Sequence, residues 1–377
     1  MSWECKKLGD IIEIKKGTYI TKKESKEGPY PVILGGQEPA YYIDTFNHTG
    51  KAIVVSRSGA SAGYVSFWNE PIFVTDGFLI EPKNNINVDF LYYLVKSHQA
   101  ELQGKQGGAA IPHVNPRIIN AIQVMVPNIE MQERIVDILS AYDDLIENNQ
   151  KQIKLLEEAA QRLYKEWFVD LRFPGYENTP ITDGVPQGWR LDVVKSVVSL
   201  LSGYAFKSSD FVDNGKYGIV TIKNVQDGNF DGENVNTITE IPSKMPSHCV
   251  LNNGDILLSL TGNVGRVCLV NGDKYLLNQR VAKLDSKYPA YAYCLFRNKD
   301  MFDIMNNLAN GAAQQNLSPI RTENVRILIP SDILIKKFED VVSPMIAKML
   351  VLNKSNSNLK QARDRLLPKL MSGELKV

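Results

Sequence analysis

The sequence has few cysteines, no long apolar run and no excess of either charge. Only four of its 377 residues are cysteine and none forms a CxxC pair, so we expect free, buried thiols rather than a metal centre. Lys and Arg number 43 against 42 Asp and Glu, which provides no global basic field. The first residues lack a signal-peptide core, and no apolar run could span a bilayer. We therefore expect a cytoplasmic protein that does not enter membranes.

Enzyme motifs are also scarce. The chain has no Asn/Asp-Pro-Pro-Phe/Tyr tetrapeptide for amino methylation and no Gly-x4-Gly-Lys-Ser/Thr loop for nucleotide phosphates. Residues 59–63 do spell GxSxG, the nucleophile elbow of serine hydrolases. That elbow requires a following helix, whereas the next residues, YVSFWNEPIFV, are typical of a strand, and the matching loop at 262–265 has no serine. A glycine-turned hairpin is therefore preferred over the hydrolase alternative.

What the chain does contain is an internal repeat. Residues 107–168 overlay residues 310–371 without a gap at an offset of 203, with identities that include Pro116/Pro319. At the front of each half the offset is 186, as in Trp3/Trp189, so the second half is 17 residues longer internally. The chain is therefore predicted to hold two copies of one module. Weaker likenesses join 51–65 with 254–267 and 88–97 with 289–298.

Each copy consists of a globule followed by a long helix. Aliphatic runs punctuated by Gly and Asn predict short strands in the globules. Residues 132–168 contain neither Pro nor Gly, and at ~1.5 Å per residue they would span roughly 55 Å, too long for one globule, so this helix needs a partner. We predict an α+β fold in which two mixed α/β globules alternate with two long helices that pair with each other within the chain. The expected boundaries are 1–128 for the first globule, 129–172 for the first helix, 173–188 for a Pro- and Gly-rich linker, 189–330 for the second globule and 331–377 for the second helix.

The seam of the predicted coiled coil appears as seven-residue apolar series in both helices. Residues 129–175 carry six Lys/Arg against ten Asp/Glu and residues 331–377 carry nine against five, so their opposite net charges favour pairing. Asn149 is either a buried polar residue that sets the register or an exposed Asn at a frayed edge. Ser343-Pro344 fits an N-cap followed by Pro, so the second helix is expected to restart there. The predicted seam residues are Ile135, Leu139, Tyr142, Ile146, Asn149, Ile153, Leu156, Leu163, Phe338, Met345, Met349, Leu352, Leu359 and Leu366.

This arrangement resembles a known family. Two globules alternating with two long helices, together with GDILLSLTGNVGRV, LLNQRVAKL, GAAQQNLSPIRTENVRILIP and PNIEMQERIVDIL, resemble the specificity subunits of type I restriction-modification systems over essentially the whole chain. The resemblance implies that each globule is a target-recognition domain for one half of a split double-stranded DNA sequence. It also implies that the two long helices form an antiparallel intrachain coiled coil with a pseudo-two-fold repeat. This coiled coil would separate the two globules and dock two copies of an adenine-N6 methyltransferase, the modification subunit.

The resemblance places all catalysis outside this chain. It implies S-adenosylmethionine in the modification partner, and ATP and Mg in restriction or motor subunits where these are present. This chain itself is expected to need no cofactor. Two departures stand out: the second helix lacks a counterpart of Gln132, and the first globule has TDGFLI where the second has LNQRVA. The second departure predicts that the two globules differ in how they recognise DNA.

The DNA-binding candidates are polar residues on Gly-punctuated loops, because Arg, Lys, Asn, Gln and small hydroxyls read base edges in the major groove. Loop arginines also serve in surface ion pairs, and loop amides often cap turns. Neither globule is basic, with thirteen Lys/Arg against twelve Asp/Glu in 1–128 and fifteen of each in 176–330. A protein-protein scaffold without DNA readout is the alternative from another class. The candidates, of which Arg57 and Arg280 are the sharpest, are Gln37, Arg57, Ser58, Ser61, His113, Lys223, Asn224, Thr261, Asn263, Arg266, Asn278, Gln279, Arg280, Gln314 and Gln315.

Overall fold

The structure, a computed structural model of the chain, describes residues 3–36, 38–104, 113–309 and 315–377. It divides into two compact units: unit 1 is Met1–Leu145 with Leu359–Val377, and unit 2 is Ile146–Asn358. Each unit therefore contains one globule and the portions of both long helices that pack on it. Among the described residues, no helix has the length and apolarity that a membrane crossing requires.

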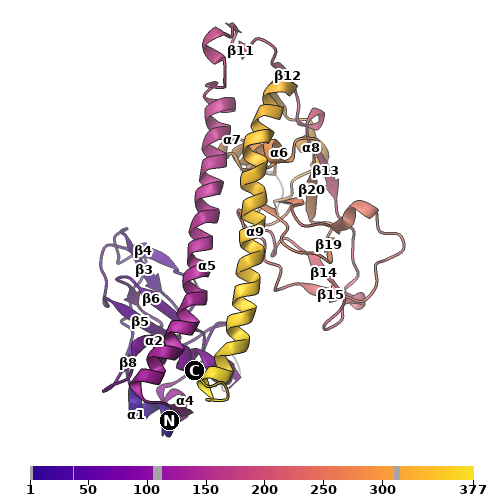
Figure 1. Cartoon of the computed structure of the whole chain (residues 1–377). Helices are drawn as coiled ribbons and strands as arrows, with labels where there is room; N and C mark the ends of the chain where they lie inside the picture. Colours follow the sequence, from indigo (N-terminus) through magenta and orange to yellow (C-terminus); the bar gives the residue numbers. More distant parts are fainter. Residues whose placement is uncertain (1–2, 37, 105–112, 310–314) are drawn as a thin grey trace. The chain divides into compact units, whose positions relative to one another are not determined.

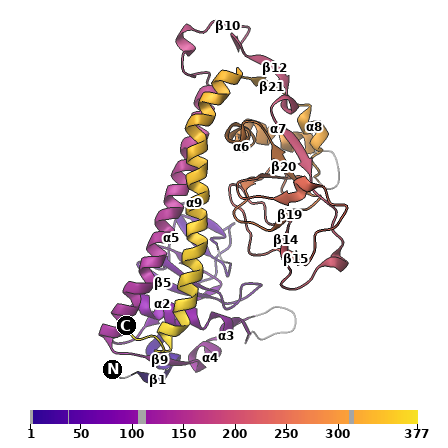
Figure 2. The ribbon, with the colours of Figure 1, turned by 45° about the vertical axis from the view of Figure 1, so that its right-hand side comes forward.

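Two long helices, α5 (Ile129–Tyr164) and α9 (Asp332–Met371), provide the helical part of both units. They lie side by side in both views of the ribbon (Figure 1 and Figure 2). In unit 2 Phe338, near the start of α9, contacts Tyr164 at the end of α5, while the Asn149 amide lies 2.8 Å from that of Asn356. Rising numbers on one helix thus meet falling numbers on the other, and the predicted antiparallel pairing is confirmed.

The helix α9 continues without a break through Pro344. The expected restart at Ser343-Pro344 is therefore wrong. The Ser343 Oγ donates a hydrogen bond to the Glu339 Oε2 at 2.9 Å, one turn earlier, instead of capping a new helix. At the end of α5 the chain adds one π-helical turn, Lys165–Val169, before the segment between the repeats.

The globule of unit 1 is built on an antiparallel sheet with the strand order β2-β8-β5-β6. A second sheet, β4-β3-β7, contains one parallel pair, β3 with β7, and strands β1 and β9 form a separate ribbon. The strands are β1 (Glu4–Lys7), β2 (Ile12–Lys16), β3 (Tyr30–Ile33), β4 (Tyr41–Ile43), β5 (Lys51–Ser56), β6 (Val65–Asn69), β7 (Phe73–Val74), β8 (Gly77–Pro82) and β9 (Gln123–Val126), and the helices are α1 (Leu8–Ile11), α2 (Val88–Ser97), α3 (Gln99–Gly104) and α4 (Pro116–Ala121).

The globule of unit 2 repeats this topology and adds one strand, β16, to its smaller sheet. Its main sheet has the order β13-β20-β17-β18, its second sheet is β15-β14-β19-β16 with β14 parallel to β19, and β12 pairs with β21. The strands are β12 (Arg190–Val193), β13 (Ser199–Ser202), β14 (Tyr217–Val220), β15 (Asn236–Ile238), β16 (Val250–Leu251), β17 (Ile256–Ser259), β18 (Val267–Leu269), β19 (Tyr275–Leu277), β20 (Val281–Asp285) and β21 (Arg326–Ile329), the helices are α6 (Pro289–Arg297), α7 (Lys299–Ala309) and α8 (Pro319–Glu323), and a short hairpin, β10 (Ile181–Thr182) with β11 (Val185–Pro186), lies between the repeats. The predicted internal duplication is thus confirmed at the level of strand order.

The additional length of the second copy lies in its smaller sheet. The connection from β3 to β4 covers residues 34–40, whereas the equivalent connection from β14 to β15 covers 221–235. The strand β16, which pairs with β19, has no counterpart in the three-stranded sheet of unit 1. The main sheets, by contrast, have the same strand order.

The GxSxG sequence at 59–63 forms the turn between the antiparallel strands β5 and β6. Gly59 and Gly63 both have positive φ angles, +82° and +84°, which glycine adopts without steric cost. The Gly63 amide donates to the Ser56 carbonyl at 2.8 Å. A strand rather than a helix follows, so the hairpin interpretation is confirmed and the nucleophile elbow is not formed.

Three of the four cysteines are buried and all four are free. Burial raises the pKa of the Cys268 thiol to about 12, so this side chain behaves as a small apolar residue. Cys5 differs from the expectation, because it is exposed on β1 with its Sγ 3.3 Å from the Gln123 Oε1. Among the described residues, no group of three His, Cys, Asp or Glu side chains is placed to hold a metal ion.

None of the predicted seam residues is exposed. Ile135, Leu139, Ile146, Asn149, Phe338, Met349 and Leu352 are buried, and Tyr142, Ile153, Leu156, Leu163, Met345, Leu359 and Leu366 are half-buried. Asn149 resolves to the first of its two readings, because it is 9% exposed and its Nδ2 donates to the Asn356 Oδ1. A buried amide pair of this kind disfavours a shifted register, because a shift would leave both amides unpaired.

The opposite net charges of the helices produce only one ion pair between them among the described residues. It joins the Asp143 carboxylate to the Arg363 guanidinium in unit 1. The other pairs formed by residues of these helices include Lys151 with Glu147 at 2.5 Å along α5, and Arg363 with Asp364 at 2.8 Å along α9. Charge complementarity therefore contributes through a single half-buried contact, and apolar packing provides most of the pairing energy.

Candidate nucleic-acid interface

Each unit has a hollow at the same edge of its main sheet. In unit 1 a hollow of about 310 Å³ is lined by residues of β2 and β8, by Arg57 after β5, and by residues 113–116. In unit 2 a hollow of about 780 Å³ is lined by the end of β13, by the residues after β17 and before β20, and by residues 315–319. The strands and loops correspond pair by pair, so these are equivalent sites in the two repeats.

The strand register shows which side chains correspond. Ser56 pairs with Gly77 at the end of β5, and Ser259 pairs with Val281 at the end of β17. One residue beyond these pairs, Arg57 and Asp76 stand in unit 1 where Leu260 and Arg280 stand in unit 2. The first site therefore has an arginine and a carboxylate at positions where the second has a leucine and an arginine.

In unit 1 the arginine of the site has an internal partner. The Arg57 Nη1 lies 3.6 Å from the Asp76 Oδ1, and the Ser58 hydroxyl donates a hydrogen bond to the Asp76 Oδ2. Ser58 also forms a β-bridge with His113, whose side chain is exposed at the rim of the hollow. This site presents a cation that a neighbouring carboxylate offsets, together with a hydroxyl and an imidazole.

In unit 2 the arginine of the site has no side-chain partner in the part of the chain that the structure describes. The Arg280 side chain is exposed and forms no hydrogen bond or ion pair with another described residue. Thr261, Gln279 and Gln315 line the same hollow, and the Thr261 Oγ1 is a buried polar atom without a hydrogen-bond partner among the described residues. A guanidinium and amides that line one concave surface can bind a base edge or a phosphate.

Two of the sequence candidates serve the fold instead. Asn224 is only 1% exposed, and its side chain is fully engaged with the backbone: the Oδ1 accepts from the Thr221 amide at 2.8 Å, and the Nδ2 donates to the carbonyls of Asp231 and Asn234. It fixes the loop between β14 and β15 and cannot reach a ligand, so assigning it to DNA is wrong. The half-buried Asn278 accepts from the Arg280 amide at 3.3 Å and caps the turn before β20.

The remaining candidates lie on the turns around the sites. Arg266 and Asn263 belong to the turn between β17 and β18, where the Arg266 Nη1 donates to the Gln226 Oε1. With its amide oxygen turned toward Arg266, Asn263 accepts from both terminal guanidinium nitrogens at 3.3 Å. Lys223 is exposed on the neighbouring loop, and Ser61 is half-buried in the turn of unit 1. Gln37 and Gln314 lie outside the described residues.

Sequence reasoning missed Asp76, although it flagged the TDGFLI segment that contains it. The segment looked different from LNQRVA, but only strand pairing shows that Asp76 and Arg280 occupy equivalent positions. It also missed Lys16, which lines the hollow of unit 1. The available signal was position, because Lys16 comes directly before Gly17, the residue that overlays Gly203.

Comparison with known proteins places the chain in a family. The family model for the type I restriction modification DNA specificity domain matches residues 1–158 and 186–341. The chain therefore belongs to this family, and the two matched stretches correspond to the two repeats described above.

The chain is similar over its full length to named specificity subunits. It is 28% identical over 408 aligned residues to the type I restriction enzyme MjaIX specificity subunit of Methanocaldococcus jannaschii, covering 100% of this chain and 94% of that protein. It is 26% identical to the MjaVIII specificity subunit of the same organism, covering 100% and 93%. The crystal structure of a type I restriction-modification system S subunit from M. genitalium has the same fold, with a TM-score of 0.60, 18% identity and coverage of 98% and 96%.

Proposed function

We propose that this chain is the DNA-specificity subunit of a type I restriction-modification complex. Each globule reads one half of a split double-stranded target through the hollow at the edge of its main sheet. The observation that carries this proposal is the repeat of one site on one topology with different side chains. Equivalent sites that present different donors suit a target whose two halves differ in sequence.

In unit 2 the readout centres on Arg280. A guanidinium can donate two hydrogen bonds to the O6 and N7 of guanine, and hydroxyl or amide groups can contact the neighbouring base pair. In unit 1 the group Arg57, Asp76 and Ser58 combines donors with an acceptor. A carboxylate there can accept from the cytosine amino group, which a site with only cations cannot do.

The partners in this proposal are double-stranded DNA and two copies of an adenine-N6 methyltransferase subunit that dock on the helices. The chain itself catalyses nothing and holds no cofactor. S-adenosylmethionine belongs to the methyltransferase partner, and ATP and Mg belong to restriction subunits where the system includes them. The paired helices α5 and α9 hold the two readers at a set spacing, since equivalent contacts on one face of B-DNA recur about every 34–36 Å.

The proposal is tested by mapping methylated adenines across the genome of a host with and without this gene. The expected result is a methylated motif in two short halves separated by unspecified bases, which disappears with the gene. Footprinting of the assembled complex on that motif should protect both halves. A single unsplit motif, or no gene-dependent methylation together with no footprint, would refute the proposal and favour the protein-protein scaffold.

The Arg57–Asp76 pair leads to a prediction about non-specific binding. In the Asp76→Asn variant Arg57 loses its carboxylate partner, while the new amide can still accept from Ser58. The freed guanidinium can then neutralise one more phosphate. Affinity for unrelated duplex DNA should therefore rise, and the plot of log affinity against log salt should steepen by about 0.9. A salt titration of the assembled complex by fluorescence anisotropy measures both.

The matched control is Asp44→Asn, which removes an exposed carboxylate from the same globule. It changes the net charge equally but releases no cation at the hollow. Equal salt slopes for the two variants would mean that Asp76 acts only through net charge and does not hold Arg57.

A further inference from the structure

The last turn of the helix after β8 or β20 carries a basic residue in both units. The repeat overlays Lys96 of α2 on Arg297 of α6. The strand pairs Val55 with Val65 and Leu258 with Val267 are equivalent, so Tyr64 and Arg266, the residues just before β6 and β18, also correspond. The lysine and the tyrosine of unit 1 are thus replaced by two arginines in unit 2.

In unit 1 the helix α2 contacts the turn before β6 directly, without an inserted loop between them. The Lys96 Nζ lies 4.4 Å from the centre of the Tyr64 ring and donates to the Val65 carbonyl at 3.0 Å. An ammonium group over an aromatic face is attractive in itself. The helix α2 and the turn before β6 therefore touch directly, through one cation and one ring.

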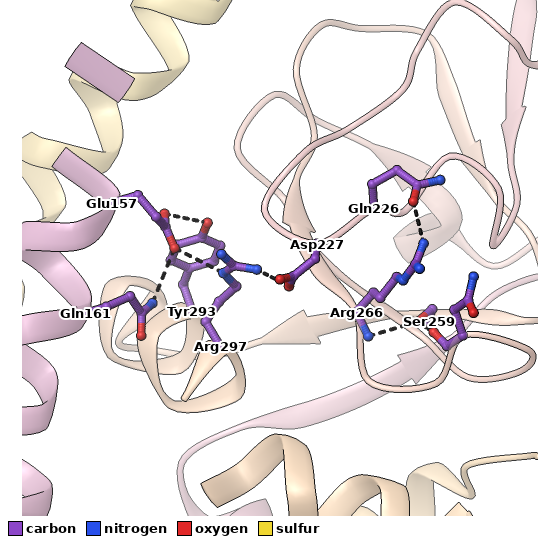
Figure 3. Close-up of polar contacts among 9 residues, drawn as sticks. Glu157, Gln161, Gln226, Asp227, Ser259, Arg266, Tyr293 and Arg297 are labelled. Atoms are coloured by element: carbon purple, nitrogen blue, oxygen red, sulfur yellow. Dashed lines mark hydrogen bonds and ion pairs between the residues drawn. The ribbon is translucent and has the colours of Figure 1, made fainter. Parts of the chain in front are cut away.

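In unit 2 two guanidinium groups at these positions would repel each other. The loop between β14 and β15 supplies the groups that separate them, as Figure 3 shows: the Asp227 carboxylate pairs with Arg297, and the Gln226 Oε1 accepts from Arg266. The loop fits closely here, because the Gly228 amide donates to the Val267 carbonyl at 2.9 Å. A Cβ on Gly228 would lie 2.9 Å from the Arg297 Nη2.

The same arginine is tied at its other side to the long helix α5. The Glu157 Oε1 accepts from the Arg297 Nε at 3.0 Å, and the Glu157 Oε2 accepts from the Tyr293 hydroxyl at 2.7 Å. The Glu157 and Arg297 side chains are only 15% and 14% exposed. Burial raises the pKa of Tyr293, so its phenol stays protonated and donates to the carboxylate. Charges held in so little water have fixed positions.

The contacts of Glu157 with Arg297, of Arg297 with Asp227 and of Gln226 with Arg266 form a chain of interactions that we call the relay. The relay uses a segment that is specific to the second repeat. The loop that carries Gln226 and Asp227 spans 221–235, whereas its counterpart in unit 1 spans 34–40. The buried Asn224 fixes the same loop, and Lys223 is exposed on it. The turn that carries Arg266 also carries Thr261, which lines the hollow of unit 2. The additional loop thus lies between α5 and the turn that lines the hollow.

We propose that Glu157, Arg297, Asp227 and Gln226 are positioning residues that hold Arg266 and its turn in place for DNA readout by unit 2. The inference rests on the proposed function and deepens it. The relay ties the half-site reader of unit 2 to helix α5 by ion pairs, whereas the reader of unit 1 has no equivalent inserted loop. A flexible arginine would lose rotamer freedom on meeting DNA, and a held one loses less, so the relay increases affinity and selectivity for that half-site alone.

The test uses the assembled complex and two duplex libraries, built on the split motif that methylation mapping identifies and each randomised in one half. The Arg280→Ala variant first identifies the half that unit 2 reads. Gln226→Ala and Asp227→Asn should then broaden base preference in that half and lower affinity for the intact target about tenfold. Preference in the other half should stay as in the wild type. Both substitutions avoid Glu157, whose loss would also leave the hydroxyl of the buried Tyr293 without its acceptor.

The matched control is Asp213→Asn, which removes an exposed carboxylate of the same unit outside the relay. This variant should select the same bases as the wild type from both libraries. Asp227→Glu keeps the charge and should recover most of the affinity. Unchanged selection by both relay variants would overturn the relay, and so would equal broadening in both halves, which is the signature of general destabilisation. If the wild-type complex selects no split motif, the proposed function itself fails, and the two failures are thereby distinguished.

Discussion

Replacement of Arg280 with alanine is expected to lower the affinity of the assembled complex for its target by roughly 5- to 150-fold. This corresponds to the ~1–3 kcal/mol that one good bidentate base contact provides. The guanidinium is exposed and has no partner among the described residues, so its removal leaves no buried group unpaired and the fold should be unaffected. Competition binding on duplexes altered one base pair at a time measures both the loss and the relaxed position.

Two further variants make this prediction specific. Arg280→Lys keeps the charge but loses the planar fork, so it should retain the salt dependence and still lose base discrimination. Lys244→Ala removes an exposed cation elsewhere in unit 2 and should weaken binding by less than about threefold. If Lys244→Ala and Arg280→Ala weaken binding equally at every base substitution, Arg280 contributes only charge and is not a reader.

The second large effect is expected in the packing of the helix pair. Phe338 on α9 is fully buried. The centre of its ring lies 5.1 Å from the ring centre of Phe168, 5.8 Å from that of Trp167 and 6.0 Å from that of Tyr164. Phe338→Ala removes this ring from an aromatic cluster that cannot collapse into the space. The free energy of unfolding should fall by about 3–5 kcal/mol, measured by denaturant titration.

The control for this prediction lies one turn away on the same helix. Val341 is 44% exposed, so Val341→Ala should change the free energy of unfolding by less than about 0.5 kcal/mol. A loss below about 1 kcal/mol for Phe338→Ala would show that α9 contributes little to the stability of unit 2.

The aromatic cluster also shows where periodicity alone misplaced side chains. The seven-residue series selected Leu163, which is half-buried, while the neighbouring Tyr164 and Phe168 are buried. Near its end α5 packs on the globule as well as on α9, as the contact of Tyr164 with Tyr291 of α6 shows. Where a helix packs against two neighbours, the buried positions differ from those of a helix pair alone. A strict seven-residue repeat does not predict this difference.

Asymmetry between the two readers emerges as the main property of the site. At equivalent strand positions one unit pairs its arginine with Asp76, whereas the side chain of Arg280 in the other unit has no partner among the described residues. The sequence indicated a difference, since TDGFLI and LNQRVA do not match, but it could not indicate which residues face each other. That correspondence depends on which residue of β8 lies opposite Ser56, and strand register is set by packing across the whole sheet.

The asparagine and glutamine candidates show the same limit of prediction from sequence. Asn224 and Gln279 are both polar residues next to strands, and no local pattern separates them. In the structure Asn224 is buried and its side-chain amide is hydrogen-bonded to three backbone groups, whereas Gln279 is exposed at the hollow. Composition and spacing describe the donors a loop carries, but burial decides whether a donor is already engaged.

The sequence by itself determined the duplication, the alternation of globule and long helix, and the apolar stripes that pair α5 with α9. These features follow from the periodicity and the self-similarity of the sequence, which do not depend on contacts between distant residues. Tertiary structure alone decided that Asp76 pairs with Arg57, that no described residue pairs with the Arg280 side chain, and that an inserted loop connects Glu157 to Arg266 through Arg297. Each of these contacts joins residues tens of positions apart, so it exists only after strand pairing and burial have selected the neighbours of each charge.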